Sequence, residues 1–287
     1  MRLALFAFAA VLAAGIRTAT AADVVLTPAL SALAEAERSF SRYAGEHGVK
    51  DSFLAYFAPD SIDFEPEPGP AIARISQWPA PKRASVLSWG PVFVDLSHAG
   101  DMGYTTGPTL GHDLGDDPRP DRHGYYFSVW RKQANGDWKV AIDVGIATPG
   151  AQSPAPELRA ASAPGYAKGT SSEIPAQRDT ILALEREPGA DAKHAAEESR
   201  LHRDGVFPIL GHDAVVADLA KRAGPTHAQP VDVVVSSSAD LAYGYGSFTR
   251  GETGGSAAEH GYYGRVWKRN PSGNWEMVAQ IEQLAQD

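Results

Sequence analysis

The sequence contains no cysteine, and this absence excludes several kinds of chemistry. Without thiols the chain cannot form disulfides, cannot use a thiolate as nucleophile or metal ligand, and cannot carry a lipid on an N-terminal cysteine. Its fold must therefore be stabilised by the packing of an apolar core.

The sequence also lacks any long run of positive charge. Acidic residues outnumber basic ones by 35 to 26, and Lys82-Arg83 and Lys221-Arg222 are isolated pairs. Binding to a phosphate backbone needs clustered Lys and Arg, so nucleic acid is excluded as the main partner.

Three catalytic motifs are missing as well: the Gly-x-Ser-x-Gly elbow, the P-loop and the His-Glu-x-x-His pair. One segment, residues 110–123, holds two His and four Asp, a composition that can bind a metal. Because Arg119 and Arg122 interrupt it, we interpret it as a solvated loop. We expect no metal and no cofactor.

The N-terminus has the pattern of a signal peptide. Arg2 precedes a fourteen-residue apolar run from Leu3 to Ile16, and Ala19-Thr20-Ala21 fits the small-x-small cleavage rule. The run is short for a membrane span, which needs about twenty residues. We therefore assign residues 1–22 to a signal peptide and expect a periplasmic or secreted protein with no membrane span after cleavage.

A segment of the sequence occurs twice. His123 begins HGYYFSVWRKQANGDW, and His260, 137 residues later, begins HGYYGRVWKRNPSGNW, with eight of sixteen positions identical. Upstream, Asp101, Tyr104 and Gly107 match Asp240, Tyr243 and Gly246, and residues 32–44 weakly resemble 181–193 through Leu, Glu and Arg. So long a period indicates two duplicated domains rather than a solenoid.

Residues 149–177 separate the copies. This segment is rich in Pro, Ala, Gly and Ser and lacks apolar periodicity, which is typical of a linker. We place domain 1 at residues 23–148 and domain 2 at residues 178–287.

Each copy is expected to begin with helices. Residues 30–45 form an amphipathic helix, in which Glu35 and Glu37 lie early and suit the helix dipole. Residues 50–57 form a second helix ended by Pro59, then a loop, and residues 71–78 a third.

Strands are expected to follow the helices. The period then changes to two, which predicts strands at residues 86–96, 101–110, 123–132 and 138–147. The fold class is therefore α+β, with helices over a bent antiparallel sheet, twice.

The last two of these strands form a hairpin at Asn135-Gly136, where the expected register pairs Ser128 with Asp143 and Trp130 with Ala141. One face is strongly apolar and is expected to pack against the helices. The opposite, mixed face carries Tyr126, Ser128 and Trp130, and we expect it to meet the sister domain, giving an intramolecular pseudo-dimer.

The segments ERSF, SWGPVFVDLSHAGDMGYTTGP and HGYYFSVWRKQANGDWKVAIDVG, in this order, resemble the SnoaL-like branch of the nuclear transport factor 2-like superfamily, in an uncharacterised group of exported bacterial proteins. The resemblance covers nearly all of domain 1, whereas domain 2 keeps the hairpin and is otherwise degenerate. It implies two tandem cone-shaped domains, each with a pocket between sheet and helices. It implies no single activity, because the superfamily includes isomerases, cyclases, dehydratases and association domains.

Candidate site residues follow from this resemblance. Asp63 and His123 are candidates for a catalytic base and its orienter, with Tyr104 on the neighbouring strand as a third catalytic group. Asp63 and His123 also have a purely structural interpretation, because His123 recurs as His260 without a matching acid. The ligand pocket is expected to be lined by Trp89, Tyr125, Trp78 and Phe64.

Three functions remain open on the sequence alone. The first is binding of a small apolar or amphipathic molecule in the domain 1 pocket, and we favour this over catalysis. The second is a cofactor-free enzyme resembling ketosteroid isomerase or a dehydratase. The third is a protein-association module of the cell envelope.

Overall fold

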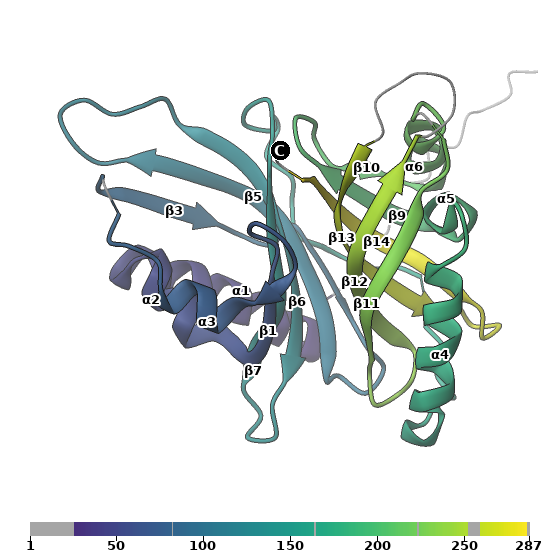
Figure 1. The fold of residues 1–287 in the computed structure, drawn as a ribbon. Coiled ribbons are helices and arrows are strands. Elements are labelled where there is room, and N and C mark those ends of the chain that lie inside the picture. Colours follow the sequence, from purple (N-terminus) through teal and green to yellow (C-terminus); the bar gives the residue numbers. More distant parts are fainter. Residues whose placement is uncertain (1–25, 82, 164, 223, 252–258, 286–287) are drawn as a thin grey trace, which may run out of the picture.

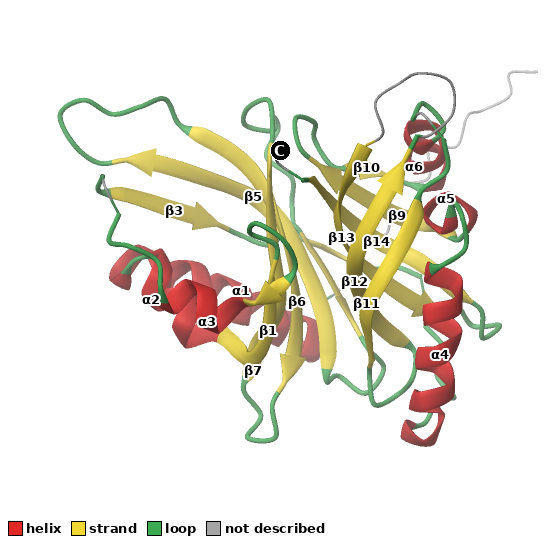
Figure 2. Cartoon of the chain, viewed as in Figure 1, coloured by secondary structure: helices red, strands yellow, loops and turns green. Residues whose placement is uncertain are grey.

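The protein has two α+β halves. The computed structural model describes residues 26–285, apart from residues 82, 164, 223 and 252–258, and the predicted signal peptide lies outside the described residues. The two sheets lie side by side in the middle of the molecule, and α1 and α4 cover their outer sides (Figures 1 and 2). None of the described helices is long and apolar enough to cross a bilayer.

The first half has three helices on an eight-stranded sheet with the order β2-β1-β7-β6-β5-β4-β8, and β3 pairs with the outer part of β5. Its helices are α1 (Pro28–His47), α2 (Val49–Tyr56) and α3 (Ala71–Ser76). Its strands are β1 (Phe57–Asp63), β2 (Gly69–Pro70), β3 (Ser85–Trp89), β4 (Phe93–Leu96), β5 (Met102–Asp113), β6 (Arg122–Lys132), β7 (Trp138–Ala147) and β8 (Arg159–Ala160).

The second half repeats this plan, with the strand order β10-β9-β14-β13-β12-β11. Its helices are η1 (Ser171–Glu173, a 3-10 turn), α4 (Ile174–Glu185), α5 (Ala190–Lys193) and α6 (His212–Leu219). Its strands are β9 (Ala195–Arg203), β10 (Ile209–Leu210), β11 (His227–Val235), β12 (Leu241–Arg250), β13 (Glu259–Arg269) and β14 (Trp275–Leu284). The predicted fold class is confirmed.

The strand that pairs in parallel with the last long strand of each sheet was not predicted. The sequence predicts a helix to Phe57 and then a loop, but α2 ends at Tyr56 and β1 follows at once, parallel to β7. Pro59 is compatible with this strand because it falls where the pairing of β1 with β7 is irregular, between Phe57 and Ile62. β9 pairs with β14 in the same parallel way.

The β6–β7 hairpin has the predicted pairing beyond its first residues, but its turn differs from the predicted one. Its turn is one residue longer than a two-residue Asn-Gly turn, because Gln133 N–H donates to Asp137 O at 2.8 Å and Gly136 has a φ of 91°. A register shift between Val129 and Trp130 then compensates for the extra turn residue, so the pairs farther from the turn have the predicted register. Ser128 therefore faces Asp143 as predicted, whereas Trp130 faces Val140 and not Ala141.

The two faces of this hairpin are used in the opposite way from the prediction. Phe127 and Val129 of the apolar face lie in the core shared by the two sheets, together with Val266 of the second half. Trp130 of the mixed face packs against α1. The reason is that α1 carries a buried carboxylate, Glu37, which accepts hydrogen bonds from the mixed face.

Reciprocal hydrogen bonds join the two halves at one end of the sheets. Asp101 Oδ2 accepts from Ser237 N–H at 3.0 Å, and its repeat equivalent, Asp240, accepts through Oδ2 from His98 N–H at 2.9 Å. The aspartates at this matching position therefore play the same role in both copies, because each accepts a hydrogen bond from the main chain of the opposite half.

The predicted linker is more structured than its composition suggests. Within residues 149–177, β8 adds to the first sheet parallel to β4, and α4 begins at Ile174, before the predicted boundary at 178. The main chain there also contacts the second half, because Ala163 O accepts from Lys268 Nζ at 3.1 Å.

The buried ion pair between the halves gives a prediction about stability. Lys268 Nζ lies 2.9 and 3.0 Å from the two carboxylate oxygens of Asp95. Lys268→Met leaves a buried aspartate without its cation, so we expect a loss of about 3–5 kcal/mol in the free energy of unfolding, measured with urea. The double variant Asp95→Asn/Lys268→Met should regain much of this loss. A single variant as stable as the wild type would contradict the assignment.

Candidate functional site

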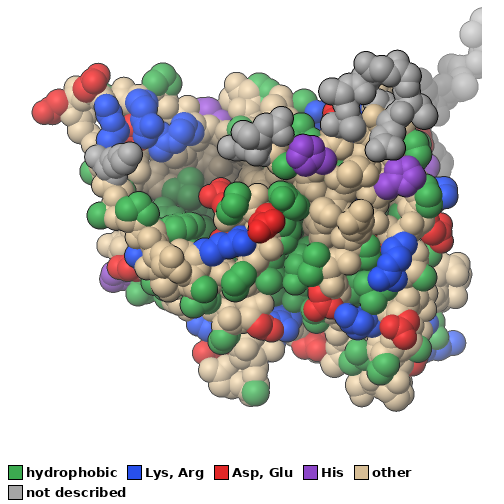
Figure 3. Space-filling model, viewed as in Figure 1, with side chains coloured by type: hydrophobic (Ala, Val, Ile, Leu, Met, Phe, Trp, Pro, Cys, Tyr) green, Lys and Arg blue, Asp and Glu red, His purple; other side chains and the backbone are tan. Residues whose placement is uncertain are grey.

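The first half encloses a cavity of about 390 Å³ between its helices and its sheet. Figure 3 shows the molecule hollowed there, with hydrophobic side chains inside the recess. The second half also reaches this cavity, because Gln283 of β14 borders it and donates a hydrogen bond to Gly145 O at 2.9 Å. The wall includes six Phe and Trp side chains: Phe40, Phe53, Phe57, Phe64, Trp78 and Trp89.

A fully buried carboxyl group lies directly behind this wall. Glu37 of α1 accepts three hydrogen bonds: from Trp89 Nε1 at 2.6 Å, from Trp130 Nε1 at 2.8 Å and from the Thr105 hydroxyl at 2.5 Å. Burial raises the pKa of Glu37 to about 7, because desolvation outweighs the three donors and the nearby charge of Asp143 adds to it.

A second carboxyl group borders the cavity itself. Asp143 of β7 accepts a hydrogen bond from the Ser128 hydroxyl at 2.6 Å. Burial raises the pKa of Asp143 to about 6, and this single hydrogen bond offsets only part of the desolvation. Tyr126, on β6, also lines the cavity, and its buried hydroxyl has no hydrogen-bond partner among the described residues. At this part of the wall a carboxyl group therefore lies with a phenol nearby.

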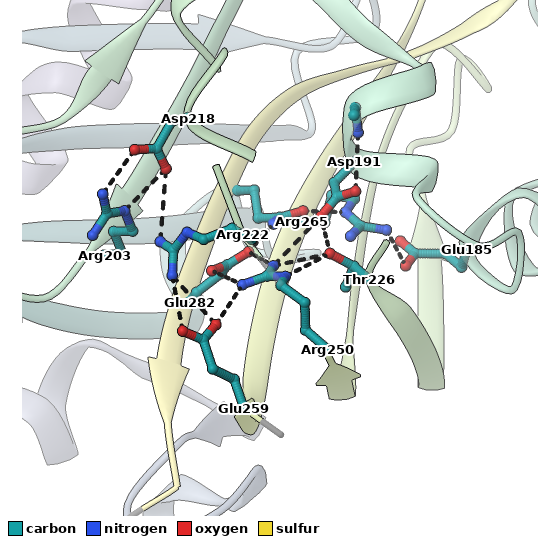
Figure 4. Close-up of polar contacts among 12 residues, drawn as sticks. Glu185, Asp191, Arg203, Asp218, Arg222, Thr226, Arg250, Glu259, Arg265 and Glu282 are labelled. Atoms are coloured by element: carbon teal, nitrogen blue, oxygen red, sulfur yellow. Dashed lines mark hydrogen bonds and ion pairs between the residues drawn. The ribbon is translucent and has the colours of Figure 1, made fainter. Parts of the chain in front are cut away.

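The second half has the same buried glutamate but satisfies it differently. Glu185 of α4 accepts from Trp267 Nε1 at 2.6 Å, as Glu37 accepts from Trp130. Its other oxygen pairs with Arg265 NH1 at 2.7 Å, and Figure 4 shows this guanidinium directed at Glu185. Arg265 occupies the repeat position of Ser128. The chain itself thus supplies a cation in the second cone.

Four of the residues predicted for the site lie together. Asp63, Phe64, Trp78 and Trp89 all border the 390 Å³ cavity. Asp63 pairs with Arg74, whose NH1 lies 2.7 Å from Asp63 Oδ1. Burial raises the pKa of Asp63, and Arg74 opposes that rise.

The other three predicted residues lie elsewhere. His123 and Tyr125 line a neighbouring cavity of about 360 Å³, where the Tyr125 hydroxyl donates to Gln152. Tyr104 is buried beside a third cavity of about 140 Å³ between the halves. The structure therefore does not bring Asp63, His123 and Tyr104 to one cavity, because His123 and Tyr104 share a face of the β5–β6 pair but lie at different ends of it.

Glu37, Asp143 and Tyr126 were not predicted as site residues. The burial of Glu37 could have been predicted from the sequence, because Glu37 lies on the apolar stripe of α1, four residues after Leu33 and three before Phe40. The Glu-Arg dipeptide at 37–38 also recurs at 185–186. Asp143 was paired correctly with Ser128, but that face was expected to meet the sister domain.

The sequence matches no family model and no curated protein. The solved structures that resemble this chain include the following three, each aligned with 40–43% of it. The CaMKII hub of S. rosetta is 19% identical, covers 43% of this chain and 99% of its own, and has a TM-score of 0.34. A ketosteroid isomerase-like protein from Erwinia carotovora atroseptica is 14% identical over 41% and 97%, with a TM-score of 0.30.

An NTF2-like protein with a cystatin-like fold from Novosphingobium aromaticivorans is 17% identical, covers 40% of this chain and 78% of its own, and has a TM-score of 0.26. These neighbours include a ketosteroid isomerase-like and an NTF2-like protein, the kinds of protein that the sequence was found to resemble.

The buried Glu37 predicts a pH dependence of stability. Its pKa rises from 4.5 to about 7 on folding, so the folded state binds the extra proton between these values. The resulting stabilisation is complete below pH 4.5 and is lost as the pH rises through 7. Relative to Glu37→Gln, the wild type should lose roughly 3 kcal/mol of unfolding free energy across this range, measured with urea.

The matched control is Glu35→Gln, an exposed change on the same helix. It should leave the pH profile of the wild type intact. Parallel profiles for the wild type and Glu37→Gln would contradict the burial of a titrating carboxyl group.

Proposed function

We propose that the cavity of the first half binds a small, mostly apolar molecule whose polar group meets Asp143 and Tyr126. The observation that carries this proposal is the 390 Å³ void itself, lined by aromatic and aliphatic side chains and by the Asp143 carboxyl group and the Tyr126 phenol, among a few other polar groups. Small-molecule sites commonly combine an apolar wall with a few polar groups that fix orientation.

Two physical costs support this interpretation. Protein interiors are normally packed as densely as organic crystals, so a void of this size forfeits contacts that a ligand would restore. The buried Tyr126 hydroxyl, without a partner among the described residues, also loses its hydrogen bond with water. A ligand that accepts from this hydroxyl and fills the void removes both costs.

The second half contributes to this site mainly as support. Its Arg265 side chain occupies the inside of its own cone, while Gln283 borders the first cavity. Export to the periplasm or the cell exterior, expected from residues 1–22, belongs to the same proposal. An association module would instead fill both cones, which the open first cavity disfavours.

A cofactor-free isomerase or dehydratase is the second candidate. The favouring observation is that burial brings the pKa of Asp143 to about 6, near the range in which a carboxylate serves as a general base. In this reading Asp143 removes a proton from the bound molecule and Tyr126 donates a hydrogen bond to the developing oxyanion. Asp143 and Tyr126 then replace Asp63, His123 and Tyr104 in the catalytic roles.

The proposal is tested by blocking the cavity from a position that tolerates a side chain. Gly145 borders the cavity, and a Cβ atom added there meets no atom within 4 Å. We expect that hydrophobic compounds which raise the Tm of the wild type in a thermal-shift screen lose this effect on Gly145→Phe. The reason is that the phenyl ring takes up space in the cavity.

The matched control is Gly45→Phe, because Gly45 is also exposed and also has no atom within 4 Å of an added Cβ. It should respond to the same compounds as the wild type does. Binding is contradicted if no compound in a broad library shifts the wild type, or if Gly145→Phe responds unchanged.

A further inference from the structure

The charges around the first cavity do not balance. Three acidic residues border it, Asp63, Glu65 and Asp143, and no Lys or Arg is among the described residues that line it. Asp63 is paired with Arg74, and Glu65 is exposed to solvent. Among the described residues, the Ser128 hydroxyl alone donates a hydrogen bond to Asp143.

Behind Asp143 lies a second acid. Glu37 is fully buried, and all three of its hydrogen-bond donors are neutral groups. The negative charges of Glu37 and Asp143 repel each other, which is one reason why the pKa of Glu37 is raised. When both groups are ionised, this end of the cavity therefore carries two negative charges without a cation among the described residues.

In the second half, a guanidinium group balances the charge of the corresponding buried glutamate. Arg265 NH1 lies 2.7 Å from Glu185, and Arg265 Nε donates to Gln280 Oε1 at 2.6 Å. The guanidinium also lies 4.7 Å from the ring centroid of Tyr263 and 5.7 Å from that of Trp267. A planar cation is thus surrounded by a carboxylate, an amide and two aromatic faces.

Each neighbour of this guanidinium has a counterpart in the first half. Glu185, Gln280, Tyr263 and Trp267 correspond in the repeat to Glu37, Asp143, Tyr126 and Trp130, in that order. Arg265 itself corresponds to Ser128, whose short, neutral side chain places no cation where the second half has the Arg265 guanidinium. The counterpart of Gln280 is moreover a carboxyl group, so the first half has more negative charge at this position than the second.

We propose that the first cavity selects an organic cation, a protonated amine or a quaternary ammonium group on an apolar body, with its charged group beside Asp143 and Tyr126. The ligand's cation takes the role that the Arg265 guanidinium has in the second half. This inference rests on the proposed binding function and specifies the class of ligand.

The other walls of the cavity suit such a ligand. Aromatic faces attract cations as well as apolar groups, and Trp is the strongest of them. The wall carries two Trp side chains, Trp78 and Trp89, and several Phe rings for the apolar body. An anionic head group beside Asp143 would instead meet negative charge, with no Lys or Arg among the described lining residues, which opposes binding.

The test compares ligands that share one apolar body and differ in charge. We suggest isothermal titration calorimetry at pH 8 with 1-adamantanemethylamine, 1-adamantanemethanol and 1-adamantanecarboxylate, and with the corresponding naphthalene set. Both carboxyl groups are ionised at this pH, since their pKa values are about 7 and about 6. The amine should bind roughly tenfold or more tightly than the alcohol, and the carboxylate most weakly.

Two variants assign any such preference to the site. Asp143→Asn should abolish the preference for amine over alcohol. Asp116→Asn makes the same change in net charge on an exposed loop outside the cavity, and it should leave the preference intact.

The outcomes separate this inference from the function on which it rests. Equal affinities for amine and alcohol, or tighter binding of the carboxylate, overturn the cation preference while binding itself stands. A preference that survives in Asp143→Asn overturns the assignment to this carboxyl group. If no member of either set binds, both the inference and the proposed binding function are contradicted for apolar bodies of this size.

Discussion

One buried carboxylate in each cone sets the arrangement of the rest of the structure. Glu37 and Glu185 lie on the first helix of their halves, and each accepts from a Trp indole on the sheet. A carboxylate removed from water needs donors or a cation, so the polar face of each sheet must turn toward its helices. The apolar faces are then left to pack against each other, which places the two sheets together in the centre of the molecule.

The two copies have satisfied this requirement in different ways. In the second half, Arg265 pairs with Glu185 and a neutral Gln280 completes a packed, internally balanced interior. In the first half, the same positions hold Ser128 and Asp143, so Asp143 borders a cavity instead and Glu37 lies buried behind it. The divergence of these two positions explains why we assign a ligand to one copy and a supporting role to the other.

Much of the fold was predictable because apolar periodicity, the repeat and the hairpin turn are local signals. The helices, the later strands and the pairing of Ser128 with Asp143 follow from them. The parallel strand β1 did not, because its seven residues include Pro59 and its partner lies some eighty residues away. The faces of the hairpin were inverted because face polarity alone cannot show that α1 buries Glu37. His123 and Tyr104 were misplaced relative to Asp63 because adjacency on paired strands does not determine which cavity a side chain borders.

The most direct test of the account is a carboxyl-carbon NMR titration of the intact protein, with resonances assigned through Glu37→Gln and Asp143→Asn. Two carboxyl groups should titrate with apparent pKa values near 7 and near 6, as a coupled pair. Each variant should remove one of these transitions and lower the other. If both groups titrate below pH 5, like solvated carboxylates, the buried acidic pair and the site built on it would be contradicted.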